Sequence, residues 1–157
     1  MMQITITAKG KQQLSEAILK ACWEIADRIY SEATLNLTGR EWPMMGANGA
    51  ISTHITDTGE LAASGSVERT KDGARVVFGA EYASYVEYGI APGGFGPPAE
   101  ILAEWCVRKL GVPKKDALGI AWAIKQKIRE EGTIARPFFR EAVYKTIAEY
   151  ENKKVKV

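Results

Sequence analysis

The sequence is poor in histidine and cysteine, and this scarcity limits the chemistry that it can support. It has one histidine, His54, and two cysteines, Cys22 and Cys106, in 157 residues. No cluster of cysteine, histidine or aspartate at metal-ligand spacing surrounds His54, so we expect no bound metal. The cysteines lie far apart, each on the apolar side of an expected helix, and a disulfide would require matching geometry. We therefore expect two buried thiols in a reducing compartment.

Long apolar stretches are also missing. No run approaches the roughly 18 apolar residues that a membrane-spanning helix needs. The first residues, MMQITITAKGK, lack the basic-then-apolar pattern of a signal peptide. We expect a protein that is made in the cytosol and does not enter a membrane.

Neither sign of charge dominates the sequence. It has 21 lysines and arginines against 19 aspartates and glutamates, a net charge of +2, which is too balanced to predict nucleic-acid binding. Basic residues gather within residues 108–129 and 153–156, but acids interrupt the first of these segments. We expect a solvated surface and no sequence-specific contact with nucleic acid. A nucleic-acid accessory role stays open as an alternative.

Motifs of catalysis and cofactor binding are scarce. Residues 94–99, GFGPPA, fit the loose dinucleotide-binding pattern, but Pro97 and Pro98 remove backbone N–H groups that would hold a pyrophosphate. The sequence contains no Gly-x-Ser-x-Gly turn and no Gly-Lys-Ser/Thr phosphate loop. Glu100 and Glu104 fit a solvated helix face. We expect no cofactor and no enzyme, and a small cytosolic enzyme with an unfamiliar site is the alternative.

What is present is typical of one globular domain. Apolar residues make up 46% and charged residues 25% of the chain, which are ordinary values. A chain of 157 residues can bury a core without disulfides, so we treat residues 1–157 as a single domain. The alternation of Ile4 and Ile6 predicts a strand, and apolar residues at three- and four-residue spacing predict an amphipathic helix over residues 11–37.

Residues 39–57 predict a long loop. They contain three glycines, a proline and an asparagine, with no sustained apolar period. A loop of this length is uncommon inside a compact domain unless it is functional or disordered. Trp42, Met44 and Met45 within it have no obvious local core. They either fold back onto the domain or contact a partner, and the sequence leaves both interpretations open.

A short helix and a hairpin are predicted next. Residues 57–64, DTGELAAS, predict a capped helical turn. The dipeptide Asp72-Gly73 is a favoured turn between two strands, and Val76 and Phe78 share one face of the second strand. Residues 82–89, YASYVEYG, fit a strand or a helical turn equally well.

Three helices are predicted in the second half of the chain. Residues 91–98, APGGFGPP, are a loop that presents Phe95. The first helix begins at Pro98, the second at a cap formed by Asp116 and the third at Pro137. The second helix ends at Gly132. Residues 151–157 form a frayed tail. The predicted fold class is α+β, with an N-terminal strand, a long helix, an antiparallel hairpin and three C-terminal helices.

Two adjacent phenylalanines open the last of these helices. We expect one to contribute to a buried stripe made of Phe139, Val143, Ile147 and Tyr150. Phe138 is rotated about 100° from that stripe, so we expect it to turn toward the hairpin, beside Val76 and Phe78. It would then join two layers of the domain.

Glu87 lies between Val86 and Tyr88, where a carboxylate has to be either exposed or paired. If the last helix docks near the hairpin, Arg136 and Arg140 are its candidate partners.

Three segments in order resemble one known family. They are DTGELAAS, VVFGAEYASYVEYG and GTIARPFFREAV, and they are similar to motifs of the siphophage tail-completion, or head–tail joining, proteins of the lambda-like gene-product-ten type. The matching positions are Thr58, Gly59 and Leu61; Tyr82, Ala83, Tyr85, Val86, Glu87 and Gly89; and Pro137, Phe138 and Phe139. The resemblance covers residues 57–89 and 132–148. Residues 90–131 depart from the compact form of the family and are interpreted as a helical insert found in its longer members.

The resemblance implies a structural role without catalysis. The chain would form a ring, six-fold on assembly, in the virion neck, after synthesis in the host cytoplasm. Its neighbours would be the head connector and the tail-tube or terminator proteins. Residues 39–57 and 90–98 would be assembly loops, with Trp42, Met44, Met45 and Phe95 as candidate contacts.

Overall fold

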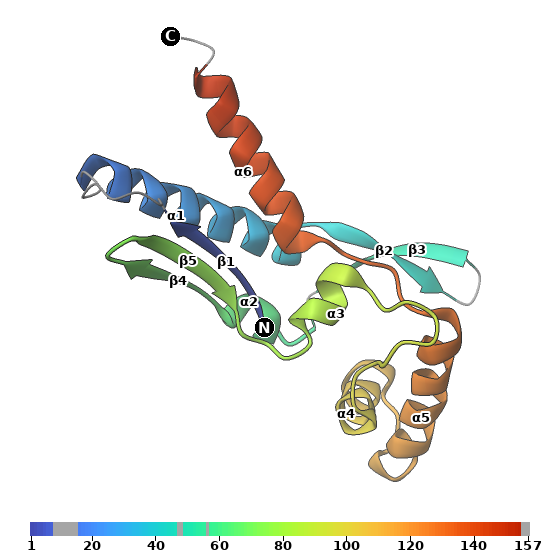
Figure 1. Ribbon diagram of the computed structural model, residues 1–157. Coiled ribbons are helices and arrows are strands. Elements are labelled where there is room, and N and C mark those ends of the chain that lie inside the picture. Colours follow the sequence, from blue (N-terminus) through green and yellow to red (C-terminus); the bar gives the residue numbers. More distant parts are fainter. Residues whose placement is uncertain (8–15, 47–48, 56, 155–157) are drawn as a thin grey trace.

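The fold is α+β, as the sequence predicts. The computed structural model describes residues 1–7, 16–46, 49–55 and 57–154 (Figure 1). In chain order the elements are β1 (Met2–Thr7), α1 (Glu16–Thr38), β2 (Glu41–Gly46), β3 (Gly49–His54), α2 (Glu60–Ala63), β4 (Gly65–Thr70), β5 (Gly73–Phe78), α3 (Ala83–Tyr88), α4 (Ala99–Leu110), α5 (Lys114–Glu131) and α6 (Phe138–Lys154). Residues 11–15 of the predicted long helix and the end of the tail lie outside the described residues.

A three-stranded antiparallel sheet lies at the centre of the fold. β5 is its middle strand, between β1 and β4. Val76 pairs with Ile4 on one side and with Val67 on the other, so apolar side chains align on one face. The long helix α1 packs on the sheet (Figure 1). The predicted hairpin is confirmed, since β4 ends at Thr70 and β5 begins at Gly73.

Aromatic rings join this sheet to α6. Phe78 is fully buried, and its ring centroid lies 5.2 Å from that of Phe138 and 5.5 Å from that of Phe139, both at steep angles. Edge-to-face pairs of this kind add about 0.5–1.5 kcal/mol each beyond the burial of their area. The prediction that Phe138 turns toward Val76 and Phe78 is confirmed. Phe139 contacts the same ring, so the two phenylalanines converge on Phe78.

The predicted stripe on α6 is only partly right. Its fully or nearly fully buried residues are Phe138, Phe139, Ala142 and Thr146, whereas Ile147 is 47% exposed. Figure 1 shows the reason, because the C-terminal half of α6 rises away from the sheet. Polar contacts with α1 hold that half: Lys145 pairs with Glu32 at 2.6 Å, and Arg28 bonds Glu149 at 3.0 Å.

The prediction of a loop over residues 39–57 is wrong for most of its length. β2 and β3 form a two-stranded antiparallel ribbon in which Glu41 pairs with His54 and Gly46 with Gly49. Pro43 and the adjacent apolar Met44 and Met45 hide the alternation that marks a strand. The ribbon extends from the end of α1, on the side of the molecule where α4 and α5 lie (Figure 1).

Trp42 is part of the core. It is 2% exposed, its indole N–H donates to the carbonyl oxygen of Asn36 at 2.9 Å, and the Arg40 guanidinium lies 4.0 Å from the centre of its ring. Of the two interpretations, folding back onto the domain is therefore correct, and Trp42 is not available to a partner. The side chains of Met44 and Met45 lie outside the described part of the structure.

Three further predictions, on residues 82–89, on Asp116 and on the cysteines, can be compared with the structure. Residues 82–89, which fitted a strand or a helix, contain helix α3. Pro113 occupies the cap position of α5, so Asp116 lies in the first turn of that helix and does not cap it. Cys22 and Cys106 are buried free thiols, as predicted.

Helices α4 and α5 form a separate lobe. They pack against each other at some distance from α1 and the sheet (Figure 1). The chain enters and leaves this lobe through neighbouring segments, because Ile90 and Thr133 form an antiparallel bridge with backbone hydrogen bonds of 3.2 and 2.8 Å. A further bond runs from the Gly93 N–H to the Arg129 carbonyl at 2.6 Å. These bonds hold the two ends of the lobe side by side.

Candidate functional site

The buried carboxylate of Glu87 organises the junction of α3 and α6. It is fully buried and accepts hydrogen bonds from the backbone N–H groups of Phe139 and Arg140, at 2.9 and 3.0 Å. These N–H groups belong to the first turn of α6, which has no partners within its own helix. Nε of Arg140 lies 3.7 Å from Oε1 of Glu87. Arg140 is therefore the partner of Glu87, and Arg136 is not.

Opposing effects act on the pKa of Glu87. Burial raises the pKa above its ordinary value of 4.5, and this is the largest effect; the two N–H bonds and the charge of Arg140 lower it in part. The remaining shift is upward. The helix terminus and Arg140 thus compensate for only part of the cost of burying this carboxylate.

Other positions of the three motif segments have structural contacts of their own. Leu61 and Ala83 are buried, and the Val86 carbonyl accepts a hydrogen bond from the Arg136 N–H at 2.8 Å. Gly89 has a φ of 66°, and a Cβ atom there would lie 2.8 Å from the Ala135 nitrogen, so only glycine fits. The motif residues on α3 and before α6 therefore meet in space and maintain the fold.

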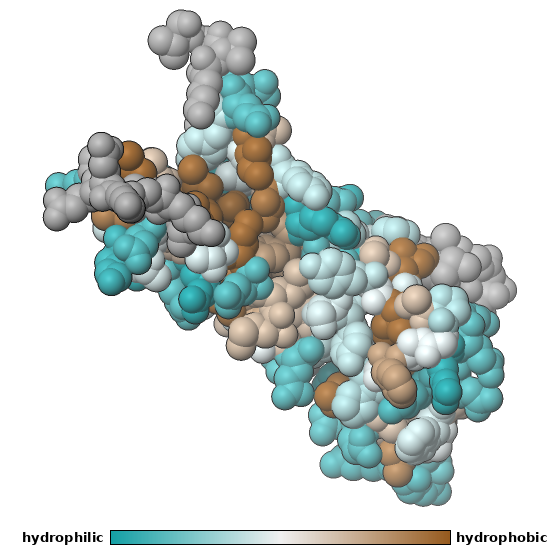
Figure 2. Space-filling view, viewed as in Figure 1, coloured by the Kyte–Doolittle hydropathy of each residue, from teal (hydrophilic) through white to brown (hydrophobic). Residues whose placement is uncertain are grey.

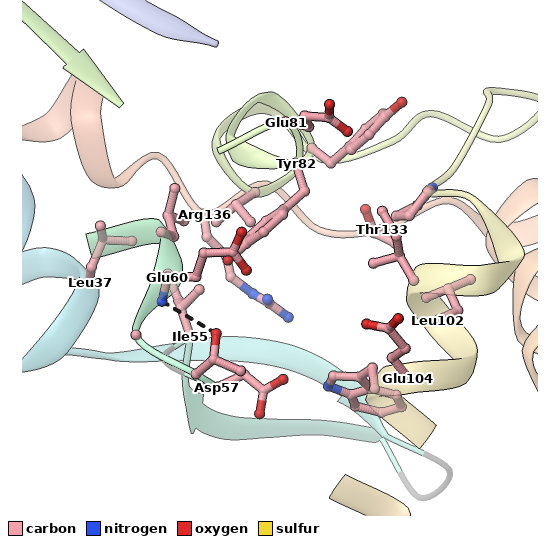
Figure 3. Close-up of a pocket in the computed structure, with 18 of the residues that line it drawn as sticks. Leu37, Ile55, Asp57, Glu60, Glu81, Tyr82, Leu102, Glu104, Thr133 and Arg136 are labelled. Carbon is pink, nitrogen blue, oxygen red and sulfur yellow. Dashed lines mark hydrogen bonds between the residues drawn. The ribbon is translucent and has the colours of Figure 1, made fainter. Parts of the chain in front are cut away.

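A cavity lies between this junction and the α4–α5 lobe (Figure 3). Its volume is about 490 Å³, within the range of small-ligand sites. Apolar and aromatic side chains from both sides form much of its wall, among them Leu37, Ile55, Tyr82, Tyr85, Leu102 and Trp105. Burial raises the pKa of Tyr82.

Asp57 and Arg136, two charged residues of the cavity wall, have different surroundings. Asp57 pairs with Arg108 at 2.9 Å and with Lys109 at 3.3 Å. Burial raises the pKa of Asp57, but the bonds from these two cations more than offset it, so the pKa lies below its ordinary value. Arg136 is different, because its Nε is buried and has no hydrogen-bond partner among the described residues. The sequence offered Arg136 as one of two candidate partners of Glu87 and gave no sign of its position in a cavity.

Exposed apolar side chains lie on the loop before α4 and on helices α5 and α6. Phe95, in the loop that precedes α4, is 86% exposed, as expected for a contact residue. On α5, Leu118 and Trp122 are about half exposed, and on α6 Tyr144 and Ile147 are exposed as well. Figure 2 shows an apolar strip along α6. The sequence did not single out these helical faces, because the predicted stripes were assigned to the core.

Two kinds of site find no support in the described part of the chain. Residues 16–46, 49–55 and 57–154 contain no group of three or more His, Cys, Asp or Glu side chains that could hold a metal ion. In the same ranges no helix is both long and apolar enough to cross a membrane. No protein family, curated protein or solved structure matches this chain.

Proposed function

We propose that this chain is a structural subunit of the neck of a tailed phage or prophage, where it joins the capsid connector to the tail tube. The observation that carries the proposal is the order of three motif segments, residues 57–64, 76–89 and 132–143. In the fold, residues of the second and third segments meet at one junction: Val86 bonds Arg136, and Glu87 caps the first turn of α6.

The role of a ring subunit requires surfaces that pair head to tail with the next copy. Phe95 on its glycine- and proline-rich loop is the most exposed of the large apolar side chains described. The β2–β3 ribbon offers two strand edges, and an isolated two-stranded ribbon is of marginal stability in water until it packs against something. Both features suit contacts that form on assembly. The ring would be six-fold and would contact the connector on one side and tail-tube or terminator proteins on the other.

The test combines genome context with assembly. We expect the gene to lie among portal, connector and tail-tube genes. Light scattering is expected to show a ring-sized particle when the protein is mixed with the neighbouring connector, and Phe95→Ala is expected to weaken that assembly. Tyr88→Ala, at a residue that is 61% exposed on α3, serves as the matched control. A gene far from all virion genes, together with no association with any connector, would rule the proposal out.

A further inference from the structure

The cavity beside the α4–α5 lobe contains an unusual cation. Figure 3 shows the guanidinium of Arg136 pointing into the cavity, in the space between Tyr82 and Asp57. Its Nε is buried without a hydrogen-bond partner, and no ion pair joins its side chain to an acid of the described residues. The backbone of Arg136 is held by its bond to Val86, so the side chain begins from a fixed point.

An unpaired guanidinium in such surroundings is unfavourable. Burial lowers the pKa of Arg136, and no neighbouring carboxylate offsets this effect. Arg136 is only partly buried, but its Nε is shielded from solvent, and a shielded polar group of a charged side chain usually has a partner because its loss of hydration is otherwise uncompensated. Arg108, the other arginine of the cavity wall, is already paired with Asp57. A positively charged group is thus left available to a ligand that brings a negative charge.

The shape and charge of the cavity limit the class of that ligand. A planar carboxylate matches the fork of a guanidinium and can accept two parallel hydrogen bonds. Glu60, Glu81 and Glu104 also line the cavity, so a group with several negative charges, such as a phosphate ester, would be repelled more strongly than a single carboxylate. The aliphatic and aromatic wall around Tyr82 and Trp105 favours an apolar body behind the charge.

We propose that this cavity is a binding site for a single carboxylate carried on an apolar body, with Arg136 as the anion-binding residue and the walls from α3 and α4 enclosing the apolar part. The carboxylate is supplied either by a free organic acid or by a glutamate side chain flanked by apolar residues in a protein segment. The site is independent of the neck role.

Calorimetric titration tests the site with matched probes. One arm uses phenylbutyrate against its neutral amide, and the other uses the capped tripeptide Leu-Glu-Phe against Leu-Gln-Phe. We expect at least one carboxylate probe to bind about tenfold or more tightly than its amide, because a buried charge-assisted pair is lost in the amide. The arm that binds identifies the source of the carboxylate.

Variants assign the effect to Arg136. Arg136→Gln is expected to remove the preference for the carboxylate, and Arg136→Lys to reduce it, because a lysine cannot form the two-pronged contact. Arg129→Gln, at an exposed arginine of α5, is the control and is expected to change nothing. Leu102→Trp fills the cavity and is expected to abolish binding of the apolar body. This second variant still tests the proposal if Arg136→Gln folds poorly. Equal affinity for acid and amide in both arms, or binding that Arg136→Gln and Leu102→Trp leave intact, would overturn the proposal.

Discussion

At the scale of single residues, Glu87 shows how a side chain from one element can complete another. Helix α6 has no capping side chain of its own before Phe138, and Pro137 provides no N–H group. The carboxylate of Glu87 takes the place of such a cap from α3, across 52 residues of chain. The residue therefore fixes both the start of α6 and its position beside α3.

We expect Glu87→Gln to lower the free energy of unfolding by about 1–3 kcal/mol. The amide keeps one acceptor oxygen but points an NH₂ group at a backbone N–H, so one buried donor is left without a partner. Urea unfolding measured at neutral pH checks this value. Glu100→Gln, at an exposed residue of α4, is the control and should lie within about 0.5 kcal/mol of the parent.

The raised pKa of Glu87 also has a pH signature. Between its ordinary value of 4.5 and the higher value in the folded protein, the unfolded chain has lost this proton while the folded chain retains it. The contribution of Glu87 to the free energy of unfolding is therefore fully present below its ordinary pKa of 4.5. It decreases as pH rises through the higher pKa of the folded protein. We expect the stability difference between the parent and Glu87→Gln to shrink as pH rises through this interval. A difference that grows with pH would contradict the assignment.

Phe138 is the second residue for which the structure gives a clear expectation. Its side chain is fully buried and meets Phe78 edge to face. Phe138→Ala is expected to cost about 3–5 kcal/mol, through lost contacts and the cavity left behind. Ile147→Ala on the same helix removes a side chain that is 47% exposed and is expected to cost far less. Thermal or urea unfolding of the two variants compares them directly.

At the scale of elements, the β2–β3 ribbon is a smaller sheet than the one centred on β5. It has two strands, and Trp42 near its base is its buried anchor, whereas β5 has a hydrogen-bonded neighbour on each side. We expect amides in β2 and β3 to exchange with solvent faster than those of β5 by orders of magnitude, because local opening of the ribbon requires little core disruption. Hydrogen-exchange mass spectrometry measures this. Equal protection would show that the ribbon opens only with the whole domain.

Some helices and strands of the fold could be predicted from the sequence, and others could not. Helix α1 and the β4–β5 hairpin were predictable because their signals are local: a long apolar stripe and the turn at Asp72-Gly73. The ribbon was missed although Asn48-Gly49 is also a turn dipeptide, since Pro43 and two adjacent methionines break the alternation. The exposed position of Ile147 depends on where α6 leaves the sheet, which local pattern does not specify.

The candidate site was harder to predict than the fold. Glu87 was recognised as a carboxylate that needs a partner, and Arg140 was among the candidates. The sequence did not predict that Glu87 accepts hydrogen bonds from two backbone N–H groups, because these bonds depend on how α3 meets α6 in space. The position of Arg136 in the cavity depends on where the α4–α5 lobe lies, and no sequence pattern near Arg136 indicates it.

At the scale of the whole molecule, two lobes share a narrow connection. The α4–α5 lobe contacts the rest through the Ile90–Thr133 bridge and through the pairing of Asp57 with Arg108 and Lys109. These salt bridges are partly exposed, so each contributes little to stability. The core around Phe78 lies entirely outside this lobe. The core can therefore be stable without the lobe, whereas the shape of the cavity depends on both parts.

The backbone bridge between Ile90 and Thr133 has a consequence for modularity. Because the two ends of the lobe already lie side by side, the chain between them can be excised and closed with a short Gly-Asn-Gly link that restores a tight turn. We expect the shortened protein to keep a cooperative unfolding transition and to lose binding of the carboxylate probe that binds the parent. The lobe would then be a cassette that can be removed without rewriting the scaffold that bears it.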